Sequence, residues 1–135
     1  MTALTEFLFP APAPRDPLSI LRWWERRRLP YNLAVGAGGL VSLVALGLVQ
    51  VLPPFSSPLE IPVGIVLVFG VMANVCYLLG PAIEIALGAI WGRSVLPTGP
   101  ALYRMGLTFS VGLALFPSLL AILAWCVATV RVLLF

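Results

Sequence analysis

Three long stretches of this chain contain no charged residue at all. They cover residues 29–59, 61–83 and 105–130. A membrane-spanning helix needs about 20 predominantly apolar residues, because the bilayer core offers no hydrogen-bond partner to an exposed peptide group. Each stretch meets that requirement, so the sequence predicts an integral membrane protein.

The composition agrees with this class. Hydrophobic residues make up 61% of the 135 residues and charged residues only 10%, whereas about 25% charged is usual in a soluble domain. We expect an all-α integral membrane protein with three transmembrane helices and one further helix at the N-terminus. The predicted parts are a cytoplasmic N-terminal arm over 1–30, and a three-helix transmembrane domain over 31–135 with spans at about 31–52, 61–80 and 103–130.

The arm carries the signals of a helix that lies on the membrane surface. Asp16 is a suitable N-cap and Pro17 suits the first helical position. The residues that follow place apolar and basic side chains on opposite sides of a helix, which predicts an amphipathic interfacial helix. Trp23 and Trp24 would anchor it at headgroup level, and three arginines would contact anionic lipid: Arg26, Arg27 and Arg28. Docking of this helix onto a cytoplasmic partner is the alternative.

The arginines predict the orientation. The chain has eight basic residues, all arginine, and three spans place seven of them on one side of the membrane. Cytoplasmic loops are enriched in Lys and Arg, so we expect a cytoplasmic N-terminus and a periplasmic C-terminus in a bacterial inner membrane. The basic residues lie at the membrane edge, which argues against binding of nucleic acid. The seven are Arg15, Arg22, Arg26, Arg27, Arg28, Arg93 and Arg104, against Arg131.

Prolines complicate the second and third spans. Gly80 and Pro81 predict a break or kink after the second span. The apolar segment 81–92 is too short to cross a bilayer, so it is either an interfacial segment or a kinked continuation of the second helix. Pro117 predicts a kink within the third span.

Small residues recur at four-residue spacing in two spans. In membranes this pattern is typical of closely packed helices, because small side chains let two backbones approach. The first span carries Gly38 and Ser42, and the third carries the longer stripe of Gly106, Ser110, Ala114 and Ser118. We expect both groups to form helix-packing or subunit interfaces.

Three polar residues of the second span form the candidate polar site. Asn74, Tyr77 and Glu84 lie on a similar side of a helix, and polar groups within a membrane are costly unless they have partners or a function. Glu84 is expected to pair with Arg93, with Arg104 or with the N-terminal arginines. A proton or ion site, or contact with a partner subunit, are the alternatives. Asn74 is expected to bridge two helices.

The remaining composition excludes several chemistries. Histidine is absent, which rules out histidine-ligated haem or chlorophyll and a histidine proton shuttle. Cys76 and Cys126 lack metal-ligand spacing and are expected to serve in packing. We therefore expect no enzyme activity, no catalytic or metal-binding residue, and no cofactor of the chain's own, while bound lipid or pigment at the surface is compatible with the sequence.

Three short segments carry a resemblance. They are WERRRLPYN at 24–32, NVCYLLGPAIE at 74–84 and GLTFS at 106–110. With them the chain resembles a group of small uncharacterised bacterial membrane proteins that have three spans and a W-E-x-R-R-x-x-Y-N lead into the first. The resemblance implies a bacterial membrane protein and no particular activity.

Two functions follow as expectations. The first is a non-catalytic accessory subunit packed in a larger bacterial inner-membrane complex, by analogy photosynthetic or respiratory, with other integral membrane subunits and lipids as partners. The second is a small oligomeric transporter or channel that uses Asn74, Tyr77 and Glu84.

Overall fold

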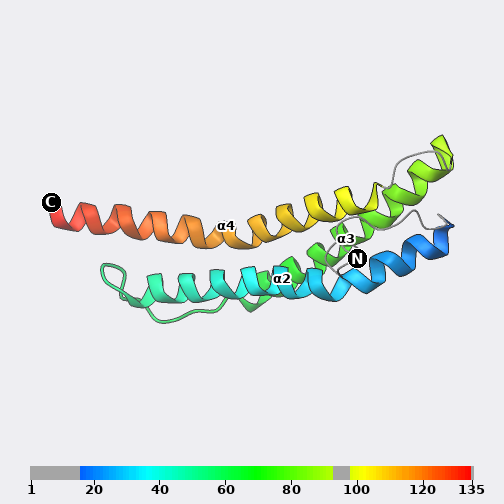
Figure 1. The fold of residues 1–135 in the computed structure, drawn as a ribbon. Coiled ribbons are helices and arrows are strands. Elements are labelled where there is room, and N and C mark those ends of the chain that lie inside the picture. The colour runs from blue at the N-terminus through cyan, green and yellow to red at the C-terminus, as the bar shows by residue number, and fades with distance from the viewer. Residues whose placement is uncertain (1–15, 93–97, 135) are drawn as a thin grey trace, which may run out of the picture.

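Three long helices make up the fold in a computed structural model of the chain, which describes residues 16–92 and 98–134 (Figure 1). Helix α2 covers Pro17–Val51, α3 covers Val63–Trp91 and α4 covers Gly99–Leu134. All regular secondary structure in the described residues is α-helical. Each helix is long and apolar enough to cross a membrane, which confirms the predicted class.

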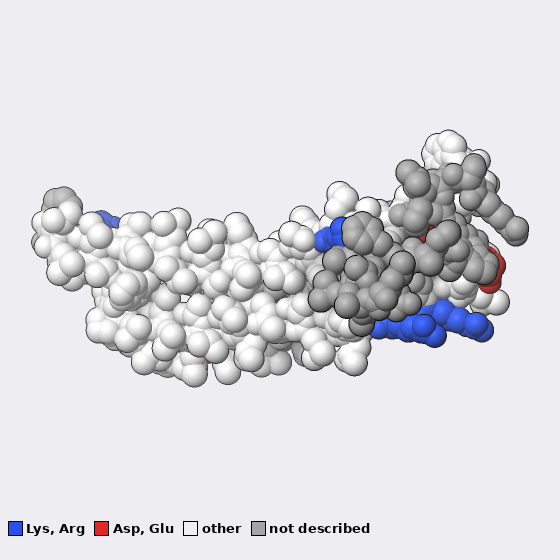
Figure 2. Space-filling model, viewed as in Figure 1, with Lys and Arg blue, Asp and Glu red and all other residues white. Residues whose placement is uncertain are grey.

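The helices run up, down and up. Helices α2 and α4 lie side by side in the same direction and make the most extensive pairing, while α3 returns antiparallel to both (Figure 1). We call the end at which α2 and α4 begin the arginine end, because five of the six described arginines lie there (Figure 2). These are Arg22, Arg26, Arg27, Arg28 and Arg104.

The separate N-terminal helix expected from the sequence is not present in the described residues. Its residues from Pro17 onward form the first turns of α2, which begins after Asp16 as predicted and continues through Pro30 to Val51. Trp24 and Tyr31, on either side of Pro30, are both buried against the other helices. Packing on both sides of the proline holds the helix together there. Residues 1–15 of the predicted arm lie outside the described residues.

Helix α3 also continues past its predicted end. It passes through Pro81, which is buried, and the segment expected to be interfacial or a continuation is its last part. The helix stops where Gly92 adopts a φ of 75° and a ψ of −172°, a backbone conformation essentially restricted to glycine. Pro117 likewise lies within the continuous α4.

The helices are longer than a bilayer requires. With 29 to 36 residues each, they measure about 44 to 54 Å at ~1.5 Å per residue. A hydrocarbon core is about 30 Å thick. The helices therefore extend several turns beyond the core or tilt within it.

Few side chains are buried within the chain. The buried hydrophobic residues gather toward the arginine end, and the outer part of α3, from Val63 to Met72, has none. In a membrane such an exposed apolar surface faces lipid tails or the helices of other proteins. The buried set is Ile20, Trp24, Tyr31, Val35, Ala73, Tyr77, Tyr103 and Ala114.

Candidate functional site

A seven-residue spacing brings the polar and aromatic residues together. Seven residues are close to two helical turns, so such pairs share one side of a helix. Trp24 and Tyr31 are so spaced on α2, Tyr77 and Glu84 on α3, and Tyr103 and Ser110 on α4. Since α3 is antiparallel to the others, the three pairs meet at two successive levels, one around Trp24 and one around Tyr31, and Tyr77 contacts both of these residues.

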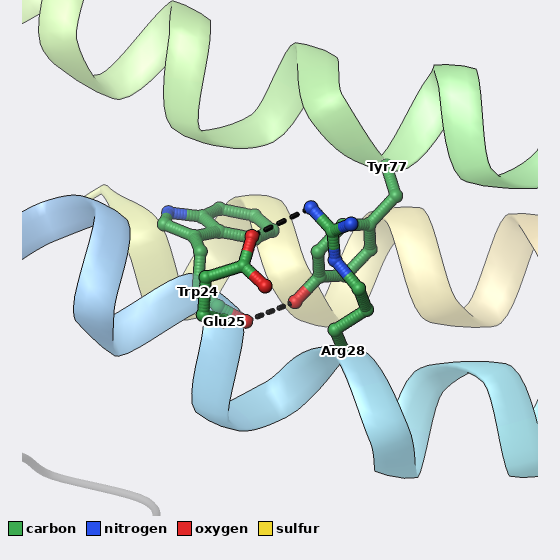
Figure 3. Close-up of polar contacts among 4 residues, drawn as sticks. All are labelled: Trp24, Glu25, Arg28 and Tyr77. Carbon is green, nitrogen blue, oxygen red and sulfur yellow. Dashed lines mark hydrogen bonds and ion pairs between the residues drawn. The ribbon is translucent and has the colours of Figure 1, made fainter.

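Trp24 is the centre of the first level. Its indole Nε1–H donates a hydrogen bond of 2.7 Å to Glu84 Oε2, and its backbone carbonyl accepts one of 2.6 Å from the Tyr77 hydroxyl. Figure 3 shows the Tyr77 side chain reaching from α3 to the Trp24 carbonyl on α2. The Trp24 side chain is only 3% exposed and packs on Gly80 of α3. This level therefore ties α2 to α3 at two points.

The Glu84 carboxylate also lies against the first turn of α4. A Cβ atom built on Gly99 would come within 2.5 Å of Glu84 Oε2, so the absence of a side chain at Gly99 makes room for the carboxylate. A negative charge near a helix N-terminus is favoured by the helix dipole, typically by about 0.3–1 kcal/mol. Glu84 is thus placed where all three helices meet.

Tyr31 is the centre of the second level. Its hydroxyl donates to the carbonyl of Ala73, at 3.1 Å, and lies 2.8 Å from Ser110 Oγ. Because the single hydroxyl proton of Tyr31 goes to Ala73, the Ser110 hydroxyl donates to Tyr31. With 2% exposure Tyr31 is the most buried residue of the core, and it joins α2 to both other helices.

Aromatic rings fill the space between these levels. Trp24 lies edge-on to Tyr77 and Tyr103, with centroids 5.3 and 6.1 Å apart. Tyr31 and Tyr77 are 4.6 Å apart. Such pairs contribute about 0.5–1.5 kcal/mol each beyond the area they bury, so the cluster stabilises the junction of the three helices.

The small-residue groups of α2 and α4 meet each other. Ser42 Oγ donates to the Ala114 carbonyl at 2.5 Å, and a Cβ atom on Gly38 would lie 3.3 Å from the Ala114 Cβ. Ser110, Ala114 and Ser118 are buried in this contact, although the Ser118 hydroxyl bonds Leu115 of its own helix. Gly106 is exposed and borders open space.

The arginines predicted to contact lipid also make contacts within the chain. Arg28 forms a 2.6 Å ion pair with Glu25, and its guanidinium lies 5.7 Å from the Tyr77 ring (Figure 3). Arg27 lies 3.7 Å above the Trp23 ring. Arg26 is exposed on the outside of α2. The anchoring role of Trp23, Trp24 and these arginines stays a prediction, and the Trp24 ring faces the bundle interior.

The three predicted polar residues are only partly brought together. Tyr77 and Glu84 meet through Trp24, whereas the Asn74 amide donates to Gly70 of its own helix at 3.0 Å. Arg93, one predicted partner of Glu84, lies outside the described residues. Cys76 and Cys126 are exposed on the surface of the chain, and no group of three metal-binding side chains occurs within 16–92 and 98–134.

Sequence reasoning missed Tyr31, Tyr103 and the indole bond of Trp24. The seven-residue spacing of polar and aromatic residues in all three helices was the available signal. No family model, no curated protein and no solved structure matches this chain.

Proposed function

We propose that this chain is a non-catalytic accessory subunit that helps to assemble or stabilise a larger bacterial inner-membrane complex. The observation that supports this most is how its polar groups are used. Trp24, Tyr31 and Ser42 form hydrogen bonds that join helix to helix. The side chains that would otherwise bind a substrate or carry a proton serve to hold the helices in place.

The outer part of α3 is the surface that best suits a partner. From Val63 to Met72 it is apolar and without a buried residue, and it includes Gly64 and Gly70, where an added Cβ has no neighbour within 4 Å. Small residues on an open face allow another helix to approach closely. A neighbouring membrane subunit of the same complex fits this face.

The transporter alternative draws less support. It requires Asn74, Tyr77 and Glu84 to act on one ion or substrate, and Asn74 bonds Gly70 of its own helix. The Tyr77 hydroxyl is bonded to the Trp24 carbonyl and Glu84 to the Trp24 indole. Transport through these residues would first have to break the contacts that join α2 and α3.

The test is purification of the tagged full chain in a mild detergent, with identification of the proteins that co-migrate. A stable complex of fixed stoichiometry with other membrane proteins is the expected result. A homo-oligomer alone would refute the proposal and favour the transporter.

Variants at the open glycines sharpen this test. Gly64→Leu and Gly70→Leu project a side chain outward from α3 without meeting the rest of the chain, and loss of glycine favours the helix by about 0.5–1 kcal/mol. Lower recovery of the complex with a stable chain would therefore locate the partner on this face. Gly36→Leu, on an open site of α2, is the matched control. Equal recovery of the complex with all three variants would exclude this face.

A further inference from the structure

A cavity of about 260 Å³ lies between α3 and α4, and Trp24 and Tyr31 of α2 form part of its wall. Aromatic and aliphatic side chains form most of its wall, with glycines on both flanks. We propose that it holds one acyl chain of a phospholipid whose anionic headgroup lies at the arginine end. The wall of the cavity includes Trp24, Cys76, Gly80, Tyr103, Gly106 and Phe109.

Two glycines line the cavity, and they differ in what lies next to them. At Gly80 the Trp24 ring packs directly on the helix, so this glycine is filled from within the chain. At Gly106 a Cβ atom would have no neighbour within 4 Å, although the rest of its stripe is buried against α2. Among the described residues, none fills the space beside Gly106, which lines the cavity.

Its position and size favour a hydrocarbon chain. Most of the wall comes from the uncharged stretches that contain Cys76 and Phe109, with Trp24, Leu102 and Tyr103 at the end nearer the arginines. In a membrane, the medium around such a wall is lipid. A volume of about 260 Å³ lies below the ~300–1,000 Å³ of sites for drug-sized ligands, which disfavours a pigment ring system. An empty gap would forfeit dispersion contacts along its whole wall, and a flexible acyl chain fills it.

Charge complementarity selects the headgroup. Gly106 lies only two residues beyond Arg104 on α4, and Trp24 lies within about one turn of Arg27 on α2. Arg28 is paired with Glu25, but among the described residues at this end five arginines outnumber the three carboxylates of Asp16, Glu25 and Glu84. Each basic residue near the surface contributes about 1 kcal/mol to the attraction of anionic lipid. Arginine side chains gather along the bundle at this end (Figure 2). A lipid chain seated between Gly80 and Gly106 therefore has its phosphate beside a positive surface.

The test compares two substitutions of the same kind on α4. Gly106→Leu fills the cavity, whereas Gly112→Leu projects into open space away from it. Both gain the same helix propensity. Native mass spectrometry of the full chain, supplied with phosphatidylglycerol, measures retained lipid. We expect Gly106→Leu to weaken retention about tenfold, because the added side chain occupies the space and removes the dispersion contacts of the acyl chain, and Gly112→Leu to match the unaltered chain.

Phosphatidylcholine with identical acyl chains tests the headgroup. Phosphatidylglycerol should be retained more strongly, and added salt should reduce the difference because it screens exposed charges. If the Gly106→Leu variant and the unaltered protein retain phosphatidylglycerol equally well, the cavity is not the binding site of the acyl chain. Equal retention of the two lipids would overturn the anionic headgroup. Both measurements use the isolated protein, so neither result depends on whether the protein joins a larger complex.

Discussion

The indole nitrogen of Trp24 and a carboxylate oxygen of Glu84 are 2.7 Å apart although 60 residues separate them in the chain. The bond joins the beginning of α2 to the last part of α3, beside the first turn of α4. From the sequence, this tryptophan and this glutamate resemble residues at a membrane surface. In the structure they connect two helices.

Replacing Glu84 should separate a structural role from a transport role. Glu84→Gln keeps an oxygen that can accept from the Trp24 indole, so we expect a loss of ~1 kcal/mol or less in stability, whereas Glu84→Leu leaves the buried N–H unpaired and should cost about 1–3 kcal/mol. Thermal unfolding in detergent measures both. Abolition of an ion-dependent flux in vesicles by Glu84→Gln, with assembly unchanged, would instead support the transporter.

Gly80 should not tolerate even one methyl group. A Cβ atom there would overlap the Trp24 ring, and overpacking of this kind costs about 1–3 kcal/mol. Gly80→Ala should therefore lower the unfolding temperature. The matched control is Gly70→Ala on the same helix, which meets nothing and should raise it slightly through helix propensity. Equal effects of the two variants would contradict the packing of Trp24 on Gly80.

Bulky residues in the α4 stripe should disturb the chain itself. Ser110→Leu removes one of the two hydrogen-bond partners of the Tyr31 hydroxyl, and Ala114→Leu inserts a larger side chain where Ala114 and Gly38 lie close together. Both should make the purified subunit easier to unfold and to digest with protease, and should thereby weaken assembly. Leu119→Ile changes a side chain that is 62% exposed and should change little. An intact, protease-resistant Ala114→Leu subunit that fails to assemble would show that the stripe contacts a partner instead.

The orientation can be tested at two loop positions. If the seven arginines predicted to share one side are cytoplasmic, Ser57→Cys should be labelled by a membrane-impermeant maleimide from outside and Thr98→Cys only from the cytoplasmic side. Both sites are tested in a Cys76→Ser, Cys126→Ser background. Labelling of both from the same side would refute the three-span arrangement.

Hydropathy was sufficient to predict the spans, but not the ends of the helices. A charge-free stretch predicts that a segment can cross the lipid. A proline predicts a break only for a helix that has no contacts with other helices. Pro81 predicts a break or kink, and the first span is predicted to begin directly after Pro30, yet both prolines lie inside continuous helices. The contacts that override them, such as Trp24 with Glu84, come from other helices and are invisible in a local pattern.

The candidate site, like the fold, was predictable only in part from the sequence. Tyr77 and Glu84 drew attention because polar residues are rare in spans, whereas Trp24 was interpreted as a headgroup anchor, the usual role of tryptophan at a membrane edge. Tyr31 begins the predicted first span, and nothing in the local sequence separates it from the tyrosines that are common at membrane edges. Only the antiparallel return of α3 shows that both aromatic residues point inward.

The hydrogen bonds between α2 and α3 also bear on how the chain is made. Three of these bonds have both partners before Gly92 in the sequence. They join Trp24 to Glu84, Tyr77 to Trp24, and Tyr31 to Ala73. Chains emerge from the ribosome N-terminal end first, so an antiparallel hairpin of α2 and α3 can close while α4 is still being synthesised. Helix α4 then adds Ser110 and Ala114 to a hairpin in which their hydrogen-bond partners, the hydroxyls of Tyr31 and Ser42, are already in position.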